Sequence, residues 1–186
     1  MRHRHLQTHM HCERVMLLAD AFAAACDLDY PAHKKLLYSA MFHDIGKIGI
    51  PDTILMHHGP LDPAQRTVME KHSVIGESIV GLMRIKDGDE IACYVRHHHE
   101  HFDGGGYPDG LRGYGIPLLA RMLTILDCYD AMREIRPYRE ALSHKDAIGI
   151  MQKETGTIHD PELLKRFVAM EKIEDIGEKY NEKKEE

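Results

Sequence analysis

The sequence lacks several features that would place it in a familiar class of protein. Tryptophan is absent, and aromatic residues make up only 6% of the 186 positions. No apolar run approaches the roughly 18 residues of a membrane span, and the N-terminus has no apolar signal-peptide stretch. The four cysteines form no CxxC pair, so neither a zinc knuckle nor a redox motif is indicated. We therefore predict a cytoplasmic protein with free thiols and no membrane contact.

An excess of basic charge is also missing. Lys and Arg number 24 against 30 Asp and Glu, so the formal net charge is −6 with histidine neutral. A nucleic-acid-binding protein needs a basic face, and we therefore expect no DNA partner. An anionic small molecule can still bind where metal ions supply the local positive charge.

The chain does have a helical spacing of apolar residues over nearly its whole length. Two Asp-Pro pairs, at 62–63 and 160–161, predict helix starts with Asp as the N-cap and Pro in the first turn. The first of these helices is expected to run on through His72 to Met83. Residues 103–117 hold six glycines and two prolines and predict a loop. We expect an all-α fold, with one domain over 1–170 and a charged, solvated tail over 171–186.

Fifteen histidines are the outstanding feature of the composition. Five of them and two aspartates project from the apolar stripes of five expected helices, namely His11, His43, Asp44, His72, His98, His99 and Asp127. Burying one ionisable group costs several kcal/mol unless the group is paired or ligated. A single such histidine is more often a satisfied core residue than a ligand. Seven such positions instead favour one shared metal centre.

The ligand types indicate which metals would bind. Imidazole and carboxylate without a nearby thiolate suit iron or manganese, with zinc, nickel and cobalt as alternatives. Seven protein ligands are too many for one tetrahedral ion, but they fit two ions bridged by a carboxylate. Two ions about 3.5–4 Å apart form a phosphoester-cleaving device, because they hold a hydroxide between them and neutralise the charge developing on the phosphate.

His43 and Asp44 are expected at a helix end, and Gly46 follows at once. Gly46 can end that helix and let Lys47 turn back toward the metal centre, where its ammonium would pair with a phosphate oxygen. A lysine facing solvent at a helix C-terminus, favoured by the helix dipole, is an equally good interpretation from spacing alone.

Several segments together resemble the HD-GYP family of proteins. Residues 43–51 (HDIGKIGIP) look like its HD signature, and residues 98–108 (HHEHFDGGGYP) look like its second signature, including the GYP triplet. Residues 11–15 (HCERV), 72–76 (HSVIG), 127–131 (DCYDA) and 136–139 (RPYR) match further family elements. The matches run from about residue 8 to 168, and the second signature is long enough to make a chance match very improbable.

The resemblance implies an HD core of five helices with additional C-terminal helices, and hydrolysis of cyclic di-GMP to pGpG and often on to GMP. It implies one metal held by His11, His43, Asp44 and Asp127, and a second held by His72, His98, His99 and the bridging Asp44. It assigns Lys47 a place near the scissile phosphate, so that Lys47 and Asp44 are the expected catalytic residues. It assigns Tyr107, Arg136 and Arg139 to the binding of guanine or phosphate.

Two departures from the family pattern affect the expected assembly. Some members carry a Glu four residues before the first His and bind a third metal, whereas this chain has Gln7, so we expect two metals. Family members usually follow a sensory or receiver domain, so an input domain or a diguanylate cyclase is an expected partner. Two alternatives stay open: hydrolysis of another cyclic dinucleotide or a nucleotide, and a catalytically weak module that only binds ligand or a partner.

Overall fold

The computed structural model describes residues 6–57, 59–134, 140–170 and 173, and the side chains from residue 8 onward. Its regular structure over these residues is helical, apart from an isolated bridge between Thr155 and His159. The elements in chain order are α1 (Leu6–Ala25), α2 (Tyr30–Phe42), η1 (Ile45–Gly49), α3 (Asp52–Leu55), α4 (Pro63–Glu70), α5 (His72–Leu82), α6 (Gly88–His97), η2 (Gly113–Gly115), α7 (Leu118–Arg133), α8 (His144–Lys153) and α9 (Pro161–Val168). The predicted all-α fold is confirmed. The expected tail over 171–186 lies outside the described residues, except for position 173.

The predicted Asp-Pro helix starts are present. Asp62 caps α4 by accepting a hydrogen bond from the Gln65 backbone N–H at 2.8 Å, and the Gln65 side chain accepts from the Asp62 backbone N–H. Asp160 caps α9 in a similar way, by accepting from two backbone N–H groups of its first turn. Such caps satisfy donors that have no partner within the helix.

The single helix expected from Pro63 to Met83 is wrong, because the chain forms two helices there. α4 ends at Glu70 and α5 begins at His72. The Lys71 backbone N–H bonds to the Val68 carbonyl, three residues back, which tightens the turn as in a 3₁₀ helix and separates the two helices. His72 therefore stands at the first position of α5, where it is buried.

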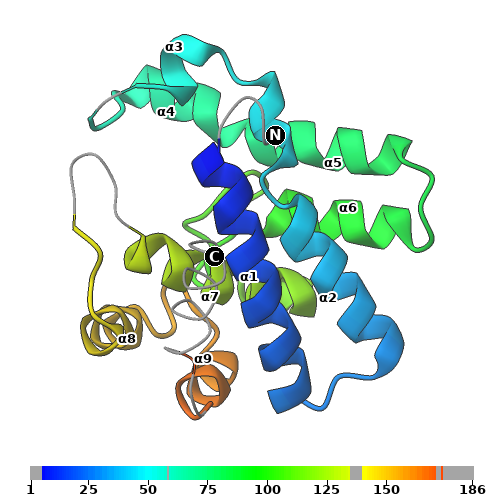
Figure 1. The fold of residues 1–186 in the computed structure, drawn as a ribbon, viewed down its shortest axis with the longest axis vertical. Helices are drawn as coiled ribbons and strands as arrows, with labels where there is room; N and C mark the ends of the chain where they lie inside the picture. The colour runs from blue at the N-terminus through cyan, green and yellow to red at the C-terminus, as the bar shows by residue number, and fades with distance from the viewer. Residues whose placement is uncertain (1–5, 58, 135–139, 171–172, 174–186) are drawn as a thin grey trace, which may run out of the picture.

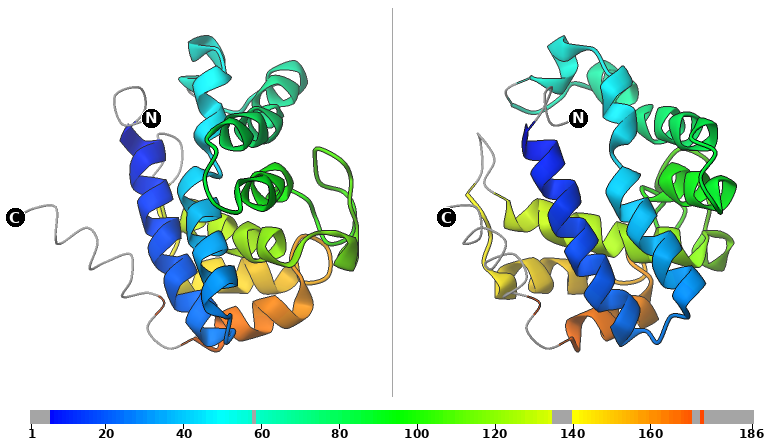
Figure 2. Two further views of the ribbon diagram at one scale, coloured as in Figure 1. Left: turned by 90° about the vertical axis from the view of Figure 1, so that its right-hand side faces the viewer. Right: turned by 45° about the vertical axis from the view of Figure 1, so that its right-hand side comes forward.

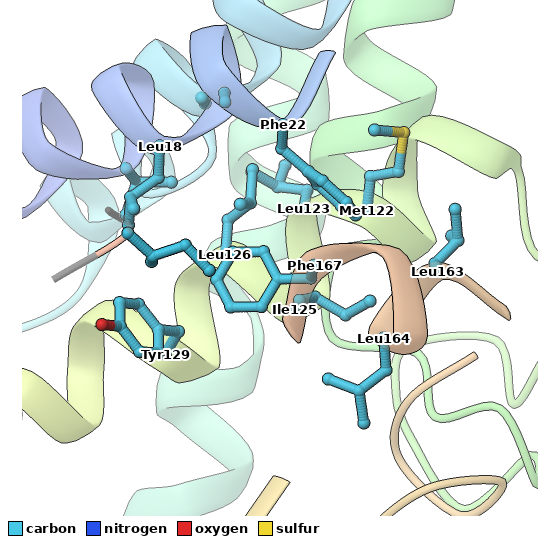
Figure 3. Packing of buried hydrophobic residues seen from close by; sticks show 14 of the residues in the cluster. Leu18, Phe22, Met122, Leu123, Ile125, Leu126, Tyr129, Leu163, Leu164 and Phe167 are labelled. Carbon is cyan, nitrogen blue, oxygen red and sulfur yellow. The ribbon is translucent and has the colours of Figure 1, made fainter. Parts of the chain in front are cut away.

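The main hydrophobic core lies where α1, α7 and α9 meet. The Phe167 ring packs edge-on against the rings of Phe22 and Tyr129, with centroid distances of 5.3 and 5.2 Å (Figure 3). Edge-to-face contact of this kind adds to the stabilisation from burial alone. A smaller cluster of buried residues, which includes Val80 and Ile91, joins α5 to α6.

The five helices that carry or adjoin the predicted ligands pack against one another. Figures 1 and 2 show α1 beside α2 and α5 beside α6, with α7 crossing behind α1 and α2 in the view of Figure 1. α8 and α9 follow these five helices on the C-terminal side. Within the described ranges, no helix is long and apolar enough to span a bilayer.

Candidate metal centre

The first triad consists of His11, His43 and Asp127, which come from helices far apart in the sequence. His11 lies on α1, Asp127 lies on α7, and His43 directly follows the last residue of α2. His11 Nε2 is 3.1 Å from His43 Nε2 and 3.0 Å from Asp127 Oδ1. The three ligand atoms lie within 4.8 Å of one another, so one ion can contact all three.

The second triad consists of His72, His98 and His99. His72 opens α5, and His98 and His99 directly follow α6. The Nε2 atom of His72 is 3.4 Å from that of His98 and 3.1 Å from that of His99. His72 and His98 are buried, and the ligand atoms of this triad also lie within 4.8 Å of one another.

Asp44 lies between the two triads and offers one carboxylate oxygen to each. Its Oδ2 is 3.7 Å from His43 Nε2, and its Oδ1 is 3.6 Å from His72 Nε2. The carboxylate is 2% exposed, so it cannot rely on water to balance its charge. This position is the one that a bridging ligand between two ions requires.

Hydrogen bonds on the outer side of three imidazoles leave their inner nitrogens available to a cation. Three rings donate from Nδ1 to the backbone carbonyl three residues earlier: His43 to Ala40 at 2.8 Å, His72 to Met69 at 2.7 Å and His98 to Val95 at 2.6 Å. A carbonyl only accepts, so Nδ1 carries the proton and Nε2 of the neutral ring presents a lone pair. The Nε2 atoms of His72 and His98 thus face each other lone pair to lone pair, which a metal ion between them would satisfy.

The two triads differ in charge. Burial alone would lower the pKa of His11, but the carboxylates of Asp127 and Asp130 raise it to about 10. In the second triad, burial lowers the pKa of His72 and lowers that of His99 to about 3. Burial also holds the pKa of His98 well below its usual value, and the neighbouring His99 lowers it further. The second triad is therefore poor at holding a proton, as neutral metal ligands must be.

Lys47 turns toward Asp44 and is only partly exposed. Its Nζ lies 2.6 Å from Asp44 Oδ2. Burial would raise the pKa of Asp44, but the Lys47 ammonium, with His43 and His72, holds it well below its usual range. Of the two interpretations left open by the spacing, the structure therefore favours a lysine that turns back toward the expected ligands.

The expected role of Gly46 as a helix end is wrong. Gly46 lies inside η1, and α2 ends earlier, at Phe42. A Cβ atom on Gly46 would lie 1.8 Å from the His72 carbonyl oxygen and 2.5 Å from the Gly76 nitrogen. Glycine is needed here because η1 packs its backbone directly on α5, which brings Asp44 to His72.

The expected substrate-binding residues are only partly within the described chain. The Tyr107 ring lies tilted over the His99 ring, with 4.8 Å between centroids and 31° between planes. Arg136 and Arg139 lie outside the described residues. The backbone of α1 includes Gln7 one turn before His11, but its side chain is also outside them.

Sequence reasoning missed two sets of residues at the centre. The first is Cys12, whose Sγ lies within 4.8 Å of ligand atoms of His43 and Asp44; burial raises the pKa of this thiol, so its neutral form is favoured and no thiolate is placed there. Asp130 and Arg14 were also missed, although each is three residues after a ligand, at the spacing that shares a helix face. Asp130 contacts the outer nitrogen of His11, at 2.7 Å.

Comparison with known proteins decides the family. The model of the HD domain family matches residues 3–163. The chain belongs to the HD domain family. It is 34% identical over 187 residues to a cyclic di-GMP phosphodiesterase of Thermotoga maritima, covering 99% of this chain and 50% of that protein. It is 35% identical to a 3'3'-cGAMP-specific phosphodiesterase of Vibrio cholerae, covering 87% of this chain and 34% of that protein. The HD-GYP resemblance is thereby confirmed.

A solved structure agrees on the fold. The crystal structure of a cyclic GMP-AMP specific phosphodiesterase of V. cholerae superimposes with a TM-score of 0.68 at 16% identity, covering 91% of this chain and 48% of that one. The chain thus spans half the length, or less, of these relatives. The match supports the HD-type helical fold of the described residues.

Proposed function

We propose that this chain hydrolyses cyclic di-GMP to linear pGpG as a metal-dependent phosphodiesterase, with either pGpG or GMP as the end product. One observation carries the proposal: two triads of metal-ligating atoms are joined by the two oxygens of a single buried carboxylate. The names of the relatives point to cyclic dinucleotides as the substrate class. We assign the phosphohydrolase domain to residues 1–170.

The residues present fit two divalent transition-metal ions, and iron or manganese suits the imidazole and carboxylate donors best. His11, His43 and Asp127 would hold one ion, His72, His98 and His99 the other, and Asp44 would contact both. A bound pair would lower the pKa of the attacking water and neutralise charge on the phosphate. We propose two ions and not three, because Gln7 offers a neutral amide where an additional cation would need a negative charge.

Lys47 and Tyr107 position the substrate around this centre. The Lys47 ammonium stands beside Asp44, so a phosphate held at the centre lies within its reach and its charge opposes the negative charge that builds up during cleavage. Tyr107 lies over His99 at the edge of the second triad, where its ring can support a base. Arg136 and Arg139 are proposed to hold guanine or phosphate on the basis of their motif.

A second candidate substrate is 3'3'-cGAMP. Relatives of comparable identity, 35% and 34%, are named for the two activities. Lys47 and Tyr107 would contact a phosphate and the face of a base, and both dinucleotides have these groups. A module that only binds ligand is the weaker alternative, since the chain has all seven expected ligands. On the basis of the family resemblance we propose an input domain or a diguanylate cyclase as partner, and we propose a cytoplasmic location.

The test is product analysis with purified protein of known metal content. Cyclic di-GMP and 3'3'-cGAMP are supplied separately and together, and the linear and mononucleotide products are separated over time. We expect pGpG to form first and cyclic di-GMP to be consumed faster in the mixture. Preferential loss of 3'3'-cGAMP would favour the second substrate, and binding without any product would favour the binding module.

A further inference from the structure

The outer nitrogens of four metal-facing imidazoles are held in two different ways. In His43, His72 and His98, Nδ1 donates to a backbone carbonyl, as described above. In His11, Nδ1 donates to a side chain, the Asp130 carboxylate, at 2.7 Å. A backbone carbonyl is present whatever side chain its residue carries, so these three contacts do not depend on residue identity. The orientation of His11 therefore depends on the identity of one residue, 119 positions away.

Asp130 is itself held rigidly. Arg14 donates from Nε to Asp130 Oδ1 and from Nη2 to Asp130 Oδ2, both at 2.8 Å. The same Arg14 Nη2 also donates to Glu134 at 3.0 Å. Asp130 is 4% exposed and Arg14 is 9% exposed, so these contacts form in a largely dry environment. A two-point Arg–carboxylate contact fixes the plane of the carboxylate as well as its distance.

The helix geometry explains why these residues meet. His11 and Arg14 are three residues apart on α1, and Asp127 and Asp130 are three residues apart on α7, so each pair shares a helix face. His11 meets both aspartates, with Nε2 toward Asp127 and Nδ1 toward Asp130. Asp127 takes the inner nitrogen, which faces the cavity, and Asp130 takes the outer one. Asp130 therefore lies on the far side of the ring from the other ligand atoms, where both of its oxygens accept from Arg14.

We propose that Asp130 is the positioning residue of the first triad, supported by Arg14. It fixes His11 in the tautomer with the proton on Nδ1, so that Nε2 points its lone pair at the ion. The inference rests on the metal-binding role proposed for the first triad. A carboxylate on the outer nitrogen also makes the imidazole a stronger donor, and losing such an outer partner typically lowers metal affinity by about 10–100-fold.

The experiment measures metal binding and not turnover. Metal-free protein is titrated with Mn²⁺, and a chelating indicator reports the affinity of each ion. In Asp130→Ala we expect one of the two ions to bind about 10–100-fold more weakly and the other to bind unchanged. Asp130→Asn keeps an oxygen that can accept from His11 Nδ1, so it should recover part of the lost affinity. It also serves in place of the alanine variant if that variant does not fold.

Asp109 provides a matched control. Its carboxylate accepts from Arg96 Nε and Nη2, both at 2.7 Å, and lies 2.8 Å from His97 Nε2. It is an Asp–Arg–His group of the same composition outside both triads, but it is more exposed than Asp130, and with Glu100 it forms a separate group of possible metal-ligating atoms. Asp109→Ala should leave the first-triad affinity unchanged. If Asp130→Ala binds two ions as tightly as the unaltered protein, the positioning role is wrong while the metal-binding proposal stands. If the unaltered protein binds no Mn²⁺, both are wrong.

Discussion

The first and second triads supply three ligands each, but they are built differently. The first joins α1, α2 and α7 across as many as 116 residues of sequence, and it contains a carboxylate. The second joins the start of α5 to the end of α6 across 26 or 27 residues and contains only imidazoles. In the first, His11 can donate a proton to Asp127. In the second, His98 Nε2 faces His72 Nε2 without a proton to share.

This difference shows that the two triads depend on metal to different degrees. A proton can satisfy the first triad when no metal is bound, because an imidazole and a carboxylate form an ordinary hydrogen bond. The second triad has no carboxylate of its own, and burial disfavours the charged forms of its histidines. Metal should therefore order the second triad more strongly than the first.

The largest effect is expected from removing a second-triad ligand. His98→Ala should reduce the metal content from two ions per chain to one, and it should lower turnover roughly 10³-fold. The reason is that a single ion then activates the water and neutralises the phosphate charge, and the missing ion would have supplied several kcal/mol of transition-state stabilisation. Elemental analysis and the rate of product formation measure the two outcomes. His101→Ala is the control, and loss of activity there with metal content intact would show that the second triad has been misassigned.

The next largest effect is expected where η1 packs against α5 between the triads. Gly46→Ala places a Cβ atom against the rigid His72 carbonyl. We therefore expect the free energy of unfolding to fall by about 3 kcal/mol, as for an overpacked core. Asp44 should also move away from the second triad and weaken its metal binding. Gly81→Ala is the control, since its Cβ would meet nothing within 4 Å. Equal denaturant midpoints for the two variants would contradict the close approach.

A third effect separates chemistry from assembly. Lys47→Ala should lower kcat roughly 10²-fold, with a smaller change in KM, because its charge acts mainly on the transition state. Both triads should keep their ions, since Lys47 is not a ligand. Steady-state kinetics combined with metal analysis tests this. A variant that loses one ion would instead show that Lys47 maintains the Asp44 bridge.

The smallest effect concerns a buried histidine outside both triads. His159 is 1% exposed, and among the described residues neither of its ring nitrogens has a hydrogen-bond partner. Glu154 Oε2 lies 3.5 Å from its Nε2. Burial, and to a lesser extent the nearby His101, lowers the pKa of His159 to about 4. Its neutral form is thus favoured in the folded protein, in contrast to the histidines that a metal can satisfy.

The lowered pKa of His159 makes the stability of the protein depend on pH. Between about pH 6.5 and pH 4 the unfolded chain binds the proton and the folded chain does not, so stability falls as pH falls through this range. The contribution of His159 should be about 2 kcal/mol between pH 7 and pH 5. Urea unfolding of the metal-free protein at both pH values measures it. His159→Gln should show a shallower dependence, and identical slopes would contradict the assignment.

The sequence predicted much of the fold because its signals were local. Asp62 and Asp160 cap helices through their own neighbouring N–H groups, and the glycine-rich loop over 103–117 is likewise a local property. The break at Lys71 was missed because the apolar stripe continues across it. The role of Gly46 was misjudged because the carbonyl that excludes a side chain belongs to another helix.

The seven expected ligands were found because ionisable groups on apolar stripes need partners, and the structure brings all seven together. Their role as ligands remains a prediction. Asp130 was not identified because it is the partner of an outer nitrogen and not of the cavity. Cys12 was missed because it follows His11 on α1, off the stripe that was followed, yet it lies beside Asp44. Contacts of this kind depend on how helices meet, which periodicity alone does not specify.

Elemental analysis of protein purified without chelator, combined with a hydrolysis assay on the same sample, tests the central claim most directly. The claim is that two triads and one shared carboxylate hold two ions that cleave a cyclic dinucleotide. We predict about two transition-metal ions per chain, loss of hydrolysis when both are removed, and recovery when Mn²⁺ or Fe²⁺ is restored. A metal-free chain that hydrolyses cyclic di-GMP at the full rate would contradict the account.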